Sequence, residues 1–281
     1  MAKIAVIGIC GNSVFLSVDH FHKEGETLSA SGVFEEIGGK GINQAVAAAR
    51  MGASVSFLAA VGDDSDGEKC ALCAKENGID AHLKVKRGKK TTFAFILTDK
   101  KGENRVTVCR EAELTRDDVL SFEDEIKTAD ILLLQNEVPE NVNALAVEIA
   151  KHHGTKIILN PAPARELCAS VVRGIFAVTP NEQERDGLDT SLFENCITTL
   201  GSRGCSVNNK EFIESIKAEA VDTTGAGDTF NGVFAVCVAE GMDISSACKT
   251  ATVAAGLSVM KRNVLSAIPE RKEIEERLKN E

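Results

Sequence analysis

The sequence predicts an α/β protein, with a mostly parallel central sheet covered by helices on both faces. Short apolar runs, typical of strands buried on both sides, alternate along the chain with segments of helical pattern. Two glycine clusters, at residues 38–41 and 225–227, each precede a helical segment. Ligand-binding loops in parallel sheets lie at such strand-to-helix turns, so these clusters support the same fold class.

The predicted elements follow in βαβ order, which favours parallel strands joined by crossover helices. Continuous apolar runs predict strands at 3–9, 55–61, 131–134, 156–159 and 175–179, and a further strand begins at Ile197 and ends in a turn by Gly204. Helical patterns cover 41–51, 65–78, 115–128, 140–152, 164–172, 226–240, 244–260 and 270–279. Gly52 follows the first helix at the position where glycine commonly ends helices.

Two β excursions interrupt this alternation, at about residues 13–37 and 91–110. Strand-like runs at 91–98 and 104–109 flank the turn sequence DKKGE, which predicts a hairpin. We expect both excursions to form a small β-sheet lid beside the main sheet. The chain shows no clear linker, repeat or low-complexity tract, so we expect residues 1–281 to form a single domain.

Composition argues against several classes of partner. The net charge is −10, and the chain has neither Trp nor Tyr, which disfavours binding to nucleic acid or to an anionic membrane. No apolar run reaches transmembrane length, and the first residues lack the pattern of a signal peptide. Nine cysteines without a disulfide-scaffold spacing indicate reduced thiols and a cytoplasmic protein, and the single C-x-x-C, Cys70–Cys73, is expected to be structural.

The most informative stretch is residues 222–232, DTTGAGDTFNG. A helix that begins near Ala226 would direct unpaired backbone N–H groups, and the positive end of its dipole, at one point. That point suits a phosphate, and Asp228 beside it could accept a proton from an attacking hydroxyl. The alternative interpretation is a helix cap with two turn glycines, and the second glycine cluster at residues 38–44 favours the functional one.

Several other unusual loops follow predicted strands, and the carboxyl ends of parallel strands meet at one edge of a sheet. Two common nucleotide motifs are absent. Gly39-Lys40 is followed by Gly41 where a Walker A motif needs Ser or Thr, and Gly8 and Gly11 have the wrong spacing for a Rossmann fingerprint.

From Lys3 to about Pro269 the chain resembles the PfkB family of carbohydrate kinases, and within it the ribokinase group. The resemblance lies in residues 38–45 (GGKGINQA) and 222–232, supported by 160–164 (NPAPA) and 179–182 (TPNE). It implies a ribokinase-like three-layer α/β/α fold with a lid, and an enzyme that transfers the γ-phosphoryl group of ATP to a sugar hydroxyl. D-ribose is the expected acceptor, and ribose 5-phosphate the expected product.

The resemblance also implies roles for individual residues. Asp228 matches the catalytic base, and the anion hole for the transferred phosphoryl group matches Gly225, Ala226 and Gly227. Sugar contacts match Gly39, Lys40, Asn43 and Glu137. The nucleotide side matches Asn181, Thr199 and Gly201, and Glu184 matches the residue that organises Mg²⁺. Asp222 and Thr224 match positions that bind an activating monovalent cation, so K⁺ is a possible cofactor. A homodimer through the lid strands is implied as well.

The clearest departure from the family lies after the first strand. Ribokinases have Asn and then Asp there, and the Asp binds two sugar hydroxyls, whereas the matching positions here are Gly11 and Ser13. A serine hydroxyl does not replace a bidentate carboxylate at equal strength. Two alternatives therefore stay open: a kinase for another sugar, a sugar phosphate or a nucleoside, and a sugar- or nucleotide-binding regulator with weak catalysis.

Overall fold

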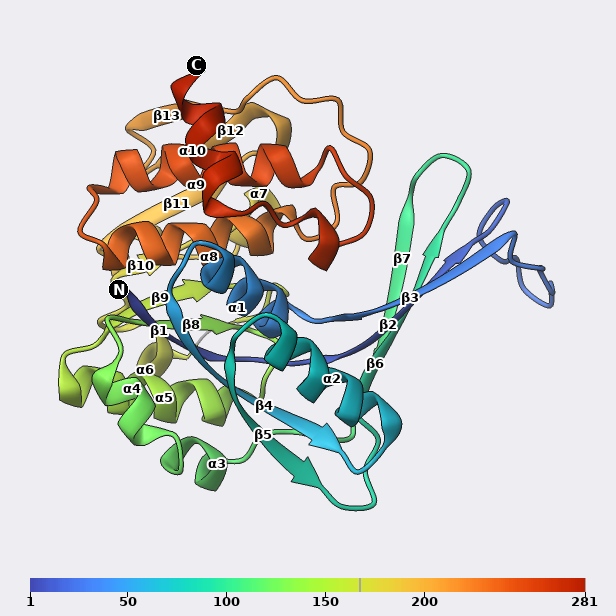
Figure 1. Ribbon diagram of the computed structural model, residues 1–281, viewed down its shortest axis with the longest axis horizontal. Helices are drawn as coiled ribbons and strands as arrows, with labels where there is room; N and C mark the ends of the chain where they lie inside the picture. The colour runs from blue at the N-terminus through green and yellow to red at the C-terminus, as the bar shows by residue number, and fades with distance from the viewer. Residues whose placement is uncertain (167, 281) are drawn as a thin grey trace.

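The computed structural model describes residues 1–166 and 168–280, and over these ranges nine strands form one sheet in the order β13-β12-β11-β10-β9-β8-β1-β4-β5 (Figure 1). Their bounds are β1 Lys3–Ile7, β4 Ser54–Gly62, β5 Asp80–Lys86, β8 Ile131–Gln135, β9 Lys156–Asn160, β10 Ala177–Val178, β11 Asn195–Thr199, β12 Gly204–Val207 and β13 Glu211–Glu214. Neighbours from β11 to β5 are parallel, and β12 and β13 continue the sheet antiparallel.

Helices cover both faces of this sheet, as Figure 1 shows. One face carries α1 Lys40–Arg50, α2 Ser65–Glu76, α8 Ala226–Ala239, α9 Ile244–Ser258 and α10 Arg271–Lys279; the other carries α3 Arg116–Leu120, α4 Glu123–Thr128, α5 Glu140–His153 and α6 Ala169–Val172. Strand β1 contributes Ile4 and Val6 to the first core and Ala5 and Ile7 to the second. This alternation explains why the strand is apolar at successive positions.

A second, four-stranded sheet has the order β3-β2-β6-β7 and projects from the body of the molecule (Figure 1). Its strands are β2 Gly11–Ser17, β3 Gly32–Gly38, β6 Thr92–Thr98 and β7 Asn104–Cys109. Strands β2 and β6 are parallel, while β2–β3 and β6–β7 are antiparallel. We call this sheet the lid; both predicted excursions supply its strands.

The predicted fold class is confirmed: a large, mostly parallel sheet lies between helical layers and carries a small additional sheet. Three predicted details differ from the structure. Strand β5 was missing from the prediction, and the predicted helix 115–128 is two helices, α3 and α4, which break at Ser121 and Phe122. The predicted helix 164–172 includes residue 167, which lies outside the described residues, and α6 is shorter, at Ala169–Val172.

No helix among the described residues has both the length and the apolar character that a membrane span requires.

The helices that matter most for the site are α1 and α8, which pack directly on each other. A Cβ at Gly232 of α8 would lie 2.5 Å from the Cβ of Ala47 in α1, so only glycine allows this close approach. The N-termini of both helices therefore lie near each other.

Candidate active site

Three adjoining cavities lie around the N-termini of α1 and α8. The lid cavity, ≈ 200 Å³, is lined by residues of the lid and of both helices, including Ser13, Glu36, Lys40, Asn43 and Asp228. The central cavity, ≈ 520 Å³, is lined by Lys40, Asn160, Thr179, Asn181, Glu182, Glu184, Thr199, Gly201, Gly225, Gly227, Asp228 and Asn231, among others. The apolar cavity, ≈ 250 Å³, is lined by Thr199, Gly201, Ile216, Ala226, Gly227, Phe230, Ala255 and Val259, among others.

The sequence-predicted residues gather in these cavities as groups. All six predicted sugar contacts line the lid cavity: Gly11, Ser13, Gly39, Lys40, Asn43 and Glu137. The predicted nucleotide and Mg²⁺ residues line the central cavity: Asn181, Glu184, Thr199 and Gly201. Lys40, Gly225 and Asp228 line both cavities. A chemical group that is transferred between molecules bound in the two cavities would therefore come close to these three residues.

Asp228 is buried in the first turn of α8, and its carboxylate is held by two amide side chains of α1. Asn43 Nδ2 donates to Asp228 Oδ2 at 2.9 Å, and Gln44 Nε2 donates to Asp228 Oδ1 at 2.9 Å. The carbonyl oxygen of the Asn43 side chain is buried and has no partner in the structure. Asn43 also lines the lid cavity, so the residue that orients Asp228 belongs to the wall of that cavity.

The N-terminus of α8 has the geometry of an anion site. Gly225 is its N-cap, with φ 77, and a Cβ at Gly225 would lie 2.3 Å from Val264 Cγ1. Glycine is therefore required both by the backbone angle and by the neighbouring side chain. A Cβ at Gly227 would meet no atom within 4 Å, so there is free space beside the first turn of the helix, where N-terminal N–H groups can bind an anion.

Lys40 is the one positively charged residue among the lining residues of the lid and central cavities. The negative charge of Asp228 raises the pKa of Lys40, and Glu137 and Glu184 add to this effect against the opposing effect of burial. The Lys40 backbone N–H donates to Glu137 Oε2 at 2.8 Å. Burial raises the pKa of Glu137, and the positive charge of Lys40 partly offsets that rise.

On the far side of the central cavity, Asn181 and Glu184 cap the short helix α7, Glu182–Arg185. Asn181 Oδ1 accepts from the Glu184 N–H at 2.8 Å, and Glu184 Oε2 accepts from the Asn181 N–H at 2.9 Å. The N-x-x-E motif is therefore a capping box as well as part of a cavity wall. Its carboxylate oxygens suit Mg²⁺, which is commonly held by one or two carboxylates together with phosphates and water.

Asp222 and Thr224 lie just before α8, where Asp222 Oδ1 accepts from the Thr224 N–H at 3.0 Å. In the nearby loop of residues 261–268, the resemblance to the family places Asn263 at a glycine position. Asn263 adopts φ 69, in the left-handed region that glycine prefers and that Asn tolerates better than most residues. The backbone shape of this loop is thus compatible with the substitution.

Residues 1–271 match the pfkB family of carbohydrate kinases. The chain belongs to this family.

Several ribokinases resemble this chain over nearly its whole length and over nearly the whole of theirs. The ribokinase of Bacillus subtilis is 37% identical, covering 99% of this chain and 100% of that protein. A ribokinase structure from Thermotoga maritima superposes with a TM-score of 0.90 at 34% identity and 100% coverage of both chains. A ribokinase structure from Arabidopsis thaliana, in complex with ribose and ATP, superposes with a TM-score of 0.86 at 25% identity and 99% coverage of both chains. The protein is therefore a sugar kinase of the PfkB family.

A buried amide network behind Asp228 was not predicted from sequence, although all of its members except Gln135 lie in the motifs described above. Gln135 Nε2 donates to Gln44 Oε1 at 2.7 Å, and Gln44 Nε2 also contacts Asn160 Oδ1 at 3.2 Å. The network continues from Asn160 to the carbonyl of Thr179, and Thr179 Oγ1 donates to Asn231 Oδ1 at 2.6 Å. The available signal covered part of the network, since Gln135 and Asn160 are polar residues at the ends of apolar strands.

Gly11, where the resemblance to ribokinases places Asn, cannot simply be replaced by a larger residue. A Cβ at Gly11 would lie 2.0 Å from the carbonyl oxygen of Thr92 on the neighbouring strand β6. The Asn that ribokinases have at this position would therefore require β2 and β6 to move apart. Ser13, two residues later, faces the lid cavity.

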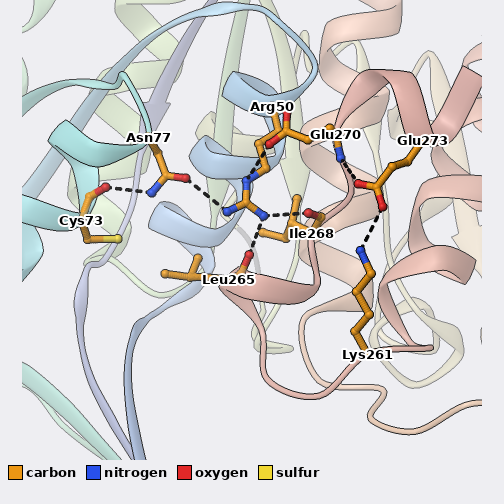
Figure 2. Close-up of polar contacts among 8 residues, drawn as sticks. All are labelled: Arg50, Cys73, Asn77, Lys261, Leu265, Ile268, Glu270 and Glu273. Carbon is orange, nitrogen blue, oxygen red and sulfur yellow. Dashed lines mark hydrogen bonds and ion pairs between the residues drawn. The ribbon is translucent and has the colours of Figure 1, made fainter.

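Arg50, the last residue of α1, fixes the loop of residues 261–268 (Figure 2). Its Nη1 donates to the carbonyl oxygens of Leu265 at 2.6 Å and of Ile268 at 2.7 Å, and its Nε lies 3.6 Å from Glu270 Oε1. The same loop places Val264 in the wall of the lid cavity. One wall of that cavity is thus anchored to the helix that also supplies Lys40 and Asn43.

Proposed function

We propose that the protein transfers the γ-phosphoryl group of ATP to the primary hydroxyl of D-ribose, giving ribose 5-phosphate. The observation that carries this proposal is the position of Asp228. Its buried carboxylate is oriented by Asn43 and Gln44 at the junction of the lid and central cavities. Sequence similarity to ribokinases, and the ribose and ATP in the Arabidopsis structure, favour ribose as the sugar.

In the proposed reaction, the sugar occupies the lid cavity with one hydroxyl beside Asp228, which accepts the hydroxyl proton as the oxygen attacks phosphorus. The N–H groups of Gly225, Ala226 and Gly227 stabilise the charge on the transferred group, and Lys40 adds a positive charge at the same junction. Gly39, Asn43 and Glu137 position the sugar. Positioning and charge stabilisation are the main requirements of phosphoryl transfer.

The nucleotide would place its phosphates in the central cavity and its base in the apolar cavity. Thr199 and Gly201 line both cavities, and Asn181 lies on the phosphate side. Glu184 would hold Mg²⁺ there, and the ion would neutralise phosphate charge. Asp222 and the Thr224 carbonyl would bind a monovalent cation such as K⁺ near the N-terminus of α8.

The charges of the lid cavity favour a neutral acceptor over a sugar phosphate. Three carboxylates line it, from Glu36, Glu137 and Asp228, against the single positive charge of Lys40. Its volume of ≈ 200 Å³ suits one monosaccharide, since a cavity of about 150 Å³ holds benzene. Both observations favour a simple sugar over the sugar phosphates and nucleosides that the sequence leaves open, and the oriented base favours an enzyme over a binding regulator.

We also propose a homodimer formed through the lid and a cytoplasmic location. Five apolar side chains of the lid are exposed, which supports a partner surface: Val33, Phe34, Phe95, Val106 and Val108. Seven buried cysteine thiols are consistent with a reducing compartment: Cys10, Cys70, Cys73, Cys196, Cys205, Cys237 and Cys248.

An ADP-release assay with Mg²⁺-ATP tests the proposal, with ribose, deoxyribose, fructose, tagatose, fructose phosphates and nucleosides as acceptors, each with and without K⁺. We expect ribose to give the highest kcat/KM, and K⁺ to increase it. A higher kcat/KM on a phosphorylated sugar or a nucleoside would contradict the proposed acceptor. ATP binding without turnover on any acceptor would favour the regulator instead.

A further inference from the structure

Glu36 is an unassigned carboxylate in the wall of the lid cavity. It is half-buried on β3 and lies directly opposite Ser13 of β2 in the antiparallel register. Both residues line the cavity, so both side chains point to the same face of the lid. The other lid side chains on this face are mainly apolar, among them Phe15, Ala94, Ile96, Val106 and Val108.

The carboxylate of Glu36 is oriented by the loop of residues 261–268. The Val264 N–H donates to Glu36 Oε1 at 2.8 Å, and the Leu265 N–H donates to Glu36 Oε2 at 3.4 Å. Arg50 fixes this loop from the other side (Figure 2). A carboxylate has about four acceptor sites, so two backbone donors leave capacity for further hydroxyl groups. Burial raises the pKa of Glu36, as expected for a carboxyl group that is partly removed from solvent.

We propose that Glu36 binds hydroxyl groups of a neutral sugar, and so supplies from β3 the carboxylate that ribokinases supply from the position of Ser13. This inference rests on the proposed function. Directly opposed residues in a sheet have Cβ atoms about 4.5–5.5 Å apart, and the longer Glu side chain spans part of that distance. The lid therefore still has a carboxylate at this position along the cavity, but on β3 at Glu36 instead of on β2 at Ser13.

A purely structural role is the competing explanation, because Glu36 also links the lid to the loop of residues 261–268. The two roles predict different kinetics. Loss of a link would affect folding and all ligands together, whereas loss of a hydroxyl acceptor would affect the sugar alone. Moving the carboxylate back to position 13 would restore sugar binding only if the sugar uses it.

The test compares wild-type protein with Glu36→Gln, Glu36→Ala and the double variant Ser13→Asp/Glu36→Ala, using steady-state kinetics on ribose and calorimetric titration of ribose. Glu35→Gln is the matched control, since Glu35 is adjacent but points to the opposite face, where it accepts from Asn12 Nδ2 at 3.1 Å. We expect Glu36→Gln to raise the KM for ribose on the order of 10- to 100-fold, with kcat and the KM for ATP within about threefold. The double variant should recover at least tenfold of the loss seen in Glu36→Ala.

Three results would overturn the role of Glu36. These are an unchanged ribose KM in Glu36→Gln, an equal effect in Glu35→Gln, and no recovery in the double variant when its melting temperature matches that of Glu36→Ala. A different result would show that the proposed function is wrong. If wild-type protein binds ribose in calorimetry but does not turn it over, the proposed function fails, and the same titrations still measure the contribution of Glu36 to binding. Absence of ribose binding by wild-type protein would overturn both.

Discussion

The lid cavity has two walls that are built in different ways. One wall consists of the N-termini of α1 and α8, where Asp228 is connected to a buried amide network inside the main core. The other is the lid, a sheet that projects from the body (Figure 1). Several of its apolar side chains are exposed to solvent. The wall with the proposed chemistry retains the family motifs, while the lid differs at Gly11 and Ser13. Dense packing in the core restricts which residues can be substituted. In a sheet with an open face, a residue on one strand can take over the role of a residue on the neighbouring strand.

The largest expected effect lies in the core wall. Asp228→Asn keeps the shape of the side chain but removes the base, so kcat should fall on the order of 10²- to 10⁴-fold, with little change in ATP binding. Steady-state kinetics and calorimetry with ATP measure the two quantities. Asp243→Asn is the control, because Asp243 caps α9 on the surface and its replacement should leave kcat unchanged. A kcat for Asp228→Asn within threefold of wild type would show that the base is elsewhere.

Lys40→Met should reduce kcat/KM for ribose on the order of 10- to 100-fold, because it removes the positive charge between the two cavities. It should also change the pH dependence. The charge of Lys40 lowers the pKa of Glu137, which burial raises, so its removal raises that pKa further. Glu137 would then take up its proton at a higher pH, and the acidic limb of the kcat/KM profile should move to higher pH. An acidic limb at the same pH in Lys40→Met and in the exposed control Lys69→Met would contradict this.

Gln44→Leu tests the network behind the base. The substitution removes the donor to Asp228 Oδ1 and leaves the Gln135 amide without its acceptor. We expect kcat to fall about tenfold with the KM for ribose within a few-fold, and the free energy of unfolding to decrease by about 1–3 kcal/mol. Kinetics and urea unfolding measure these effects. If only the stability decreases, the network supports the fold and does not position Asp228.

The smallest effect on turnover is expected at the exposed surface of the lid. Val33→Asp should weaken the proposed dimer at least tenfold by analytical ultracentrifugation, because it places a charge on an apolar contact surface outside the lid cavity. Val85→Asp is a matched control, since Val85 is 58% exposed on β5 and Val33 is 68% exposed on β3. Equal sedimentation of both variants and wild type would place the dimer contact elsewhere or exclude it.

Much of the fold and of the site could be predicted because the signals are local. The glycine clusters mark the N-termini of α1 and α8, and the buried strands of the parallel sheet are continuous apolar runs. Strand β5 was missed because its sequence, DAHLKVK, is largely polar and lies at the edge of the sheet. The division between α3 and α4 was missed because a helical pattern continues through the break.

The remaining features depend on contacts between distant parts of the chain. Gln44 lies 184 residues from Asp228 and 116 residues from Asn160, so no sequence spacing connects them. The same applies to Glu36, whose position opposite Ser13 appears only once the register of β2 and β3 is known. Such groups require the tertiary structure, whereas the motif residues do not.

The central claim is that Asp228 activates the primary hydroxyl of a neutral sugar. The most direct test is ³¹P NMR of the product formed by wild-type protein from ribose and Mg²⁺-ATP, compared with the same reaction by Asp228→Asn. We predict a single phosphate monoester at the primary hydroxyl with wild-type protein and almost none with the variant. A phosphate at another position, or the same product at the same rate from Asp228→Asn, would contradict the claim.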